Sequence, residues 1–269
     1  MVAPIARLVL ATGVVVAVCA PGVPDAMQAT TRHGPVNSCW CCPPVGRLAQ
    51  SGATSESAIP PLDEQAGTHK AEWSKEAKAA LDRLIQGNER YASGKALHKH
   101  TSAAWRAQLA KEQHPFAAIL GCSDSRVVPD LVFDQELGSL FVGRVAGNVV
   151  NTDVDGSLEY AALHLGTRLF VALGHENCGA VTAALQAHGE DKEPPGLRRL
   201  IQHLRPVFKD IDPKLPFEKR LATAVEANVR WAMKQMADLP EARKALASGK
   251  VSLVGAVYDL ETGKVRVLE

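Results

Sequence analysis

Four short and nearly continuous apolar runs stand between residues 116 and 258, and they constrain the fold more than any other feature. They cover residues 116–120, 140–142, 169–173 and 251–258. None of them shows a clear alternation of apolar and polar side chains. Such runs are typical of parallel strands that helices cover on both faces. They predict an open, mostly parallel sheet of about four strands.

Segments with the spacing of amphipathic helices separate these runs. They cover residues 157–165, 180–187, 197–208, 218–236 and, after Pro240, 241–247. Alternation of strands and helices is typical of an α/β fold with helices on both faces of the sheet. Residues 264–268 follow the turn sequence Glu261-Thr262-Gly263 and are expected to add an antiparallel edge strand.

Extra helices are expected before the first strand. Ser74 is a suitable N-cap for a helix that follows it. The apolar stripe of that helix consists of Ala77, Leu81, Leu84, Ile85 and Tyr91. A shorter helix is expected around Trp105 and Leu109. The folded domain is therefore predicted to span residues 73–269.

The charge balance gives no reason to expect nucleic acid or an anionic membrane as a partner. The chain has 30 basic and 29 acidic residues among 269, so its net charge is +1. A protein that binds such polyanions through electrostatics carries a marked excess of basic residues. The length and a hydrophobic content of 46% are sufficient for one domain with a tail.

Residues 1–30 are interpreted as a secretory signal peptide. Arg7 precedes an apolar run, residues 8–19, that is shorter than the roughly 20 residues of a transmembrane helix. Export predicts a periplasmic or secreted protein. The alternatives are a lipid-anchored protein, if Cys19 is lipidated, and a cytoplasmic protein whose start codon lies further downstream.

Residues 31–72 are predicted to form a flexible tether, because Pro, Gly and Ser are frequent there and no apolar period is present. The tether holds Cys39, Cys41 and Cys42 around Trp40. These thiols form a redox clip or an extra metal site, or they pair with one another or with another chain. We favour pairing, because no histidine or acidic residue stands nearby at ligand spacing.

Cys122, His175 and Cys178 form the most informative functional pattern. Cys122 and His175 each follow a glycine where a predicted strand ends. Open α/β sheets bind ligands at this edge, where the strand order reverses. Two thiolates and one imidazole suit Zn²⁺, and three protein ligands leave a fourth position for catalysis. Considered singly, a cysteine at a strand end is usually a small buried apolar residue, and His175-x-x-Cys178 is a weak motif.

Asp124 and Arg126 follow Cys122 at two-residue steps. Asp124 can compete for the fourth metal position, and a two-pronged ion pair with Arg126 can hold it away. The alternative is that the pair is only a structural ion pair at a strand end.

The chain resembles the β-class carbonic anhydrases at residues 122–127, CSDSRV, and at residues 174–180, GHENCGA. Residues 141–148, 157–161 and 258–263 resemble further segments of that family. Val145 departs from it, because an asparagine commonly follows the arginine of this segment. The likeness covers the chain from about residue 75 to its end.

The resemblance implies one zinc ion per chain, bound by Cys122, His175 and Cys178. It also implies that Asp124 and Arg126 form a dyad that controls the fourth position. Asp124 becomes a zinc ligand when Arg126 releases it. The residues implied to bind substrate are Gln113, Phe141, Tyr160 and Gly179. The pocket of this family lies at a dimer interface, so a homodimer or a tetramer is expected.

The implied activity is reversible hydration of carbon dioxide to bicarbonate and a proton, through attack by zinc-bound hydroxide. One alternative is hydrolysis of a carbon dioxide analogue such as carbonyl sulfide or carbon disulfide, which the same hydroxide would attack. Another is a zinc-storage or thiol-redox protein without turnover. The open fourth position and the Asp124–Arg126 pair argue against this last alternative.

Overall fold

The computed structural model describes residues 73–97, 102–187 and 193–268. The expected signal peptide (1–30) and tether (31–72), with Cys19, Cys39, Cys41 and Cys42, lie outside the described residues and stay predictions. In the described part of the chain, no helix combines the length and the apolar composition needed to cross a membrane.

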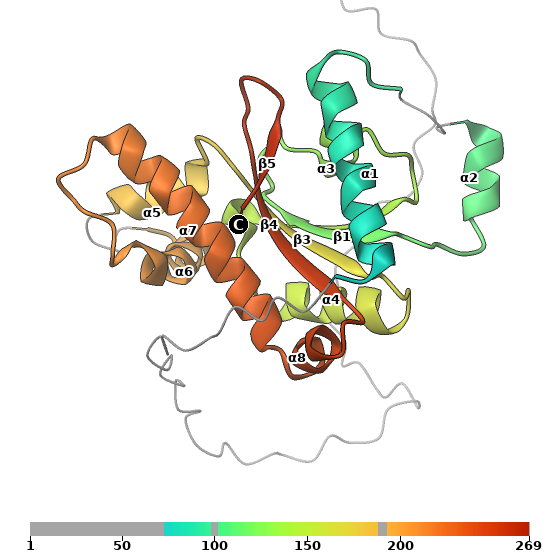
Figure 1. Ribbon diagram of the computed structural model, residues 1–269. Coiled ribbons are helices and arrows are strands. Elements are labelled where there is room, and N and C mark those ends of the chain that lie inside the picture. Colours follow the sequence, from blue (N-terminus) through green and yellow to red (C-terminus); the bar gives the residue numbers. More distant parts are fainter. Residues whose placement is uncertain (1–72, 98–101, 188–192, 269) are drawn as a thin grey trace, which may run out of the picture. The chain divides into compact units, whose positions relative to one another are not determined.

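A five-stranded sheet forms the centre of the domain, in the order β2-β1-β3-β4-β5 (Figure 1). Its strands are β1 (Ala117–Gly121), β2 (Leu140–Arg144), β3 (Leu169–His175), β4 (Ser252–Tyr258) and β5 (Val265–Val267). The first four are parallel, and β5 pairs antiparallel with β4. Every residue of β1 and β3 is buried, as expected for strands covered on both faces. The predicted fold class is confirmed.

The described helices surround this sheet, and most of them cover one of its two faces. They are α1 (Lys75–Ala92), α2 (Ala103–Leu109), α3 (Pro129–Val132), α4 (Thr152–Leu163), α5 (Gly179–Gln186), α6 (Pro195–Leu204), α7 (Phe217–Asp238) and α8 (Pro240–Ala247), with the 3₁₀ helices η1 (Ala146–Asn148) and η3 (Arg205–Phe208). Ala118 and Leu120 of β1 belong to the same core as buried residues of α4, α5 and α7. Ala117 and Ile119 point to the other face, whose core includes residues of α1 and α3. The period of two along β1 therefore divides the core into two layers.

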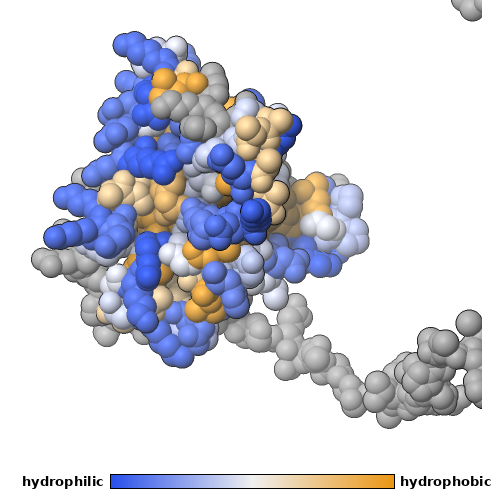
Figure 2. All heavy atoms as spheres, turned by 90° about the vertical axis from the view of Figure 1, so that its right-hand side faces the viewer, coloured by the Kyte–Doolittle hydropathy of each residue, from blue (hydrophilic) through white to orange (hydrophobic). Residues whose placement is uncertain are grey.

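The short helix α2 has no buried residue, which is also true of α8. It lies apart from the sheet (Figure 1). Figure 2 shows patches of apolar surface among polar side chains on the side of the molecule where α2 lies. Large apolar residues that remain exposed include Leu97, Leu131 and Leu137.

Two helices differ from the expected boundaries by more than two residues. Helix α4 begins at Thr152 rather than Ser157, because the Asn151 side chain accepts a hydrogen bond from the Val154 amide at 3.0 Å and caps an earlier turn. The single helix expected over residues 197–208 is wrong, since α6 ends at Leu204 and η3 follows. Pro206 lacks the amide hydrogen that a continuing α-helix requires there.

The buried side chain of Asn88 connects α1 to two distant segments. It donates hydrogen bonds to the carbonyl oxygens of Val132 (3.0 Å) and Gly263 (2.8 Å). It accepts a third from the amide of Val265 at 2.8 Å. Only 4% of Asn88 is exposed, so water cannot replace these partners. A polar residue inside the apolar stripe of α1 therefore holds the helix against α3 and the last hairpin.

Replacing Asn88 by alanine is expected to lower the free energy of unfolding by about 3 kcal/mol, because three hydrogen bonds are lost and buried backbone groups lose their partners. Urea denaturation followed by circular dichroism measures this change. Gln86→Ala, at an exposed position of the same helix, is the control and should alter stability by less than about 0.5 kcal/mol. An Asn88→Ala protein as stable as the wild type would contradict this role.

Candidate active site

The strand order brings the ends of β1 and β3 together. Strand β1 pairs with β2 on one side and with β3 on the other, so the order reverses at β1. Cys122 directly follows β1, His175 is the last residue of β3, and Cys178 is the N-cap of α5. One metal-binding atom from each of these three residues lies within 4.8 Å of the other two. The structure thus joins two motifs that are far apart in the sequence.

A glycine before His175 allows the end of β3 to pack tightly. A Cβ atom on Gly174 would lie 2.5 Å from Cγ2 of Val229 in α7, which is closer than carbon atoms pack. Glycine therefore permits α7 to lie directly against the strand end that carries His175.

The histidine is oriented for metal binding. Its Nδ1 donates a hydrogen bond to the carbonyl oxygen of Glu176 at 2.9 Å, so in the neutral ring Nε2 carries the lone pair. Nε2 is buried, and no hydrogen-bond partner for it occurs among the described residues. His175 is 0% exposed, so water does not satisfy this atom from the surface. A buried acceptor without a donor is costly, and a metal ion would satisfy it.

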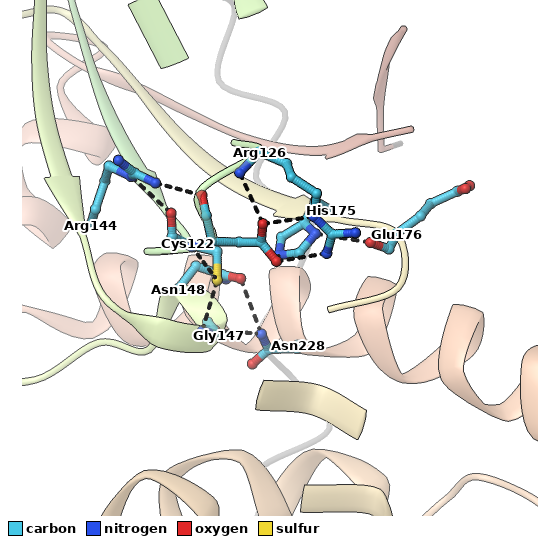
Figure 3. A network of polar contacts seen from close by, with 9 residues as sticks. Cys122, Arg126, Arg144, Gly147, Asn148, His175, Glu176 and Asn228 are labelled. Atoms are coloured by element: carbon cyan, nitrogen blue, oxygen red, sulfur yellow. Dashed lines mark hydrogen bonds and ion pairs between the residues drawn. The ribbon is translucent and has the colours of Figure 1, made fainter. Parts of the chain in front are cut away.

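Cys122 lies in a polar environment that stabilises negative charge on its sulfur, and Cys178 lies beside it. Cys122 Sγ accepts hydrogen bonds from the amides of Gly147 (3.2 Å) and Asp124 (3.4 Å) (Figure 3). A hydrogen bond from the Cys178 thiol lowers the pKa of Cys122, and Cys122 in turn raises the pKa of Cys178. Two thiolates at this separation repel each other. A divalent cation bound to both sulfurs would relieve that repulsion.

Asp124 and Arg126 form a two-pronged ion pair beside this donor cluster. Arg126 donates from Nε to Oδ1 (2.9 Å) and from Nη2 to Oδ2 (2.8 Å), and its amide also reaches Oδ1 (3.0 Å). The guanidinium holds the pKa of Asp124 well below its usual range. Oδ2 of Asp124 lies 3.9 Å from Nε2 of His175. The carboxylate is thus turned to the arginine while it borders the donor cluster.

Comparisons with known proteins identify the family. The family model described as carbonic anhydrase matches residues 117–265. Carbonic anhydrase 2 of Mycobacterium tuberculosis is 38% identical over 192 residues, which cover 69% of this chain and 90% of that protein. The solved structure of the β-carbonic anhydrase CcaA superposes with a TM-score of 0.60 and 29% identity, covering 71% of this chain and 88% of that one. This chain belongs to the β-class carbonic anhydrases.

A second similar structure belongs to a β-carbonic anhydrase whose oligomeric state is known. It comes from work on two tetrameric β-carbonic anhydrases of the filamentous ascomycete Sordaria macrospora. Its TM-score is 0.58 at 25% identity, and the match covers 71% of this chain and 97% of that one. The carbonic anhydrase fold found here therefore occurs in a tetrameric protein of the same class.

Several residues that support the carbonic anhydrase donor cluster were missed by sequence reasoning. Arg144, at the end of β2, donates from Nε to the carbonyl oxygen of Cys122 (2.9 Å) and from Nη2 to that of Asp124 (2.6 Å) (Figure 3). Asn228 of α7 donates to the carbonyl oxygen of Gly147 at 2.8 Å. The available signal was Asn228 itself, a polar residue within the buried stripe of α7.

The four residues expected to bind substrate lie on separate elements of the chain. Gly179 directly follows Cys178 and opens α5. Gln113 is exposed and precedes β1, so it lies at the opposite edge of the sheet from Cys122. Phe141 pairs in register with Ala118, well before the end of β1. Its ring centroid lies 6.3 Å from that of Tyr160, which is 46% exposed.

Proposed function

We propose that this protein catalyses the reversible hydration of carbon dioxide to bicarbonate and a proton, with one zinc ion per chain held by Cys122, His175 and Cys178. The observation that carries the proposal is the buried, unpartnered Nε2 of His175 among two thiols. Membership of the carbonic anhydrase family supports the reaction. A bound zinc ion supplies a nucleophile near neutral pH, because it lowers the pKa of water from 15.7 to roughly 7 in a three-histidine site.

The protein positions this chemistry through the shell around the donors. The amides of Gly147 and Asp124 hold Cys122 Sγ, and the Glu176 carbonyl holds the His175 ring. Outer partners of this kind fix the orientation of metal-binding side chains. Asn228 holds Gly147 in turn, so the α7 helix contributes to the site without contacting substrate.

Asp124 and Arg126 are proposed to control access to the fourth metal position. With Arg126 bound to both carboxylate oxygens, Asp124 stays ionised and accepts a hydrogen bond from the attacking water. If Arg126 releases it, Oδ2 is close enough to the His175 Nε2 atom to turn toward the donor cluster. The arginine therefore determines whether the carboxylate assists the reaction or blocks it.

We further propose that a second copy of the chain completes the pocket. Gln113 and Tyr160 are exposed, and Gln113 precedes the strand whose far end leads to Cys122. An apolar surface near Phe141 and Tyr160 suits a small apolar substrate, and an amide suits its oxygen. The assembly is a homodimer or a tetramer, and light scattering of the purified protein measures which.

Stopped-flow measurement of carbon dioxide hydration tests the proposed function. We expect a zinc-dependent rate at alkaline pH, with one zinc ion per chain by elemental analysis. Carbonyl sulfide and carbon disulfide are compared in the same preparation. Zinc-loaded protein that hydrates none of the carbon dioxide at alkaline pH would contradict the proposal.

Removal of the metal is expected to expose the two site thiols to oxidation. Cys122 and Cys178 lie close enough for their thiols to interact, and metal binding protects thiolates from reaction. After chelation and treatment with diamide, activity should be lost, and peptide mass spectrometry should find Cys122 and Cys178 oxidised. Zinc-loaded protein given the same diamide is the control. Activity that survives both treatments would count against the role of these thiols.

We also propose, from residues 1–30, that the protein is exported through an oxidising compartment. Zinc would have to protect the two thiols there, because disulfides form readily in such compartments.

A further inference from the structure

A groove of about 470 Å³ lies away from the carbonic anhydrase site, at the other end of α5. Helix α5 begins directly after Cys178 and is about 12 Å long, so its last residues are well separated from the donor cluster. The groove is formed by the end of α5, by η3 and by the first turn of α7, which lie side by side (Figure 1). Its main lining residues are Leu185, Phe208 and Ile211 on the apolar side and Arg205, Lys209 and Arg220 on the charged side.

The charges that line this groove have one sign. Among the described lining residues there are three cations and no acidic side chain. Arg205 donates a hydrogen bond from Nη2 to the carbonyl oxygen of Ala187 at 3.3 Å, at the end of α5. Its guanidinium thereby offsets the partial negative charge that a helix carries at this end. The remaining positive charge comes from Lys209 and Arg220.

Part of the Arg220 guanidinium is buried, and this part makes no hydrogen bond within the described residues. Its Nε atom is inaccessible to solvent and has no hydrogen-bond acceptor among the described residues. No ion pair of Arg220 or Lys209 occurs in that part of the chain. A buried charged donor left without an acceptor destabilises the free protein. Arg220 as a whole is only half-buried and lines the groove, so an anion there can reach the rest of this guanidinium and supply an opposite charge.

We propose that this groove binds a small organic anion, with its carboxylate or phosphate on Arg220 and Lys209 and its apolar group against Phe208 and Ile211. Arginine suits this role, because its guanidinium presents several donors to two oxygens of one anion. The volume is within the range of about 300–1,000 Å³ that is typical of small-molecule sites. This site is separate from the hydration reaction, so either proposal can fail without the other.

Calorimetric titration of the zinc-loaded, full-length protein with phenyl phosphate tests the proposal. We expect saturable binding that Arg220→Gln weakens at least tenfold. Lys219→Gln removes the same charge one residue earlier on α7, outside the groove, and should leave the affinity unchanged. Inorganic phosphate and benzyl alcohol should each bind more weakly than phenyl phosphate, because each lacks one half of the recognised structure.

Two outcomes would overturn the proposal. One is the absence of saturable binding by the wild type. The other is equal affinity in the wild type and in Arg220→Gln, which would place the anion elsewhere, including at the metal. If Arg220→Gln does not fold, as judged by circular dichroism, Lys209→Gln at an exposed position serves instead and should weaken binding at least threefold. Unchanged affinity in Lys209→Gln would overturn the proposal equally.

Discussion

Replacement of His175 by alanine is expected to abolish zinc binding and to lower kcat/KM for carbon dioxide hydration by roughly three orders of magnitude or more. The reason is the donor set. Two thiols from Cys122 and Cys178 remain, but the only neutral nitrogen in the described cluster is lost, and with it the buried lone pair of Nε2. Zinc content by elemental analysis and stopped-flow kinetics measure the two effects on the same sample.

The matched control is His203→Ala, which removes an imidazole from α6 outside the donor cluster. It should keep full zinc content and the wild-type rate. Circular dichroism is needed for both variants, because His175 is fully buried and its loss leaves a cavity. A folded His175→Ala protein that retains one zinc ion and near wild-type activity would show that this histidine is not a ligand.

Replacement of Arg126 by glutamine is expected to lower kcat/KM by about 10–100-fold while zinc remains bound, which is the usual range for partners that orient a metal site. The glutamine keeps a polar side chain but cannot bind both oxygens of Asp124. The carboxylate is then free to turn toward Nε2 of His175, which lies 3.9 Å from Oδ2 in the wild-type structure. Arg126→Lys keeps the charge and loses the two-pronged geometry, so we expect an intermediate rate.

Arg243→Gln is the control for this pair. It breaks another Asp–Arg pair, which joins Arg243 of α8 to Asp238 at the end of α7 at 3.6 Å. Its rate should equal that of the wild type. Equal rates in Arg126→Gln and Arg243→Gln would mean that Asp124 and Arg126 form only a structural ion pair.

The Asp124–Arg126 pair also makes the free energy of unfolding depend on pH. Arg126 lowers the pKa of Asp124 in the folded protein, so the pair stabilises the fold fully at pH values above the unfolded pKa, about 3.9. This contribution is lost as the pH falls below that value toward the folded pKa. The stability difference between wild type and Arg126→Gln should therefore be constant from pH 5 to 8 and diminish under acid.

Much of the fold followed from local patterns, because buried parallel strands are apolar on both faces. The runs that became β1 and β3 are buried along their whole length, and this is why their positions were predictable. The helix boundaries were less predictable where one side chain decided them. Asn151 started α4 early, and Pro206 ended the α-helical geometry expected up to residue 208.

The metal-binding residues of the site could be predicted from the sequence. The residues that hold them in place through hydrogen bonds could not. Cys122, His175 and Cys178 are recognisable because their element types and spacing suit zinc. Arg144 and Asn228 carry no such spacing, since each acts through a backbone carbonyl far away in the sequence. Gln113 shows the opposite case, because its expected role depends on the second copy of the chain that we propose.

The sequence by itself determined which atoms are available. Cys122 and His175 each stand at the end of an apolar run, and Cys178 follows three residues after His175. An acid and an arginine follow Cys122 after two and four residues. Only the tertiary structure decided that these atoms meet, because pairing of β1 with β3 places two distant strand ends at the same edge of the sheet. It also decided the state of each donor. Whether Nε2 of His175 is free, or the Asp124 carboxylate is turned to Arg126, depends on hydrogen bonds that form only in the packed chain.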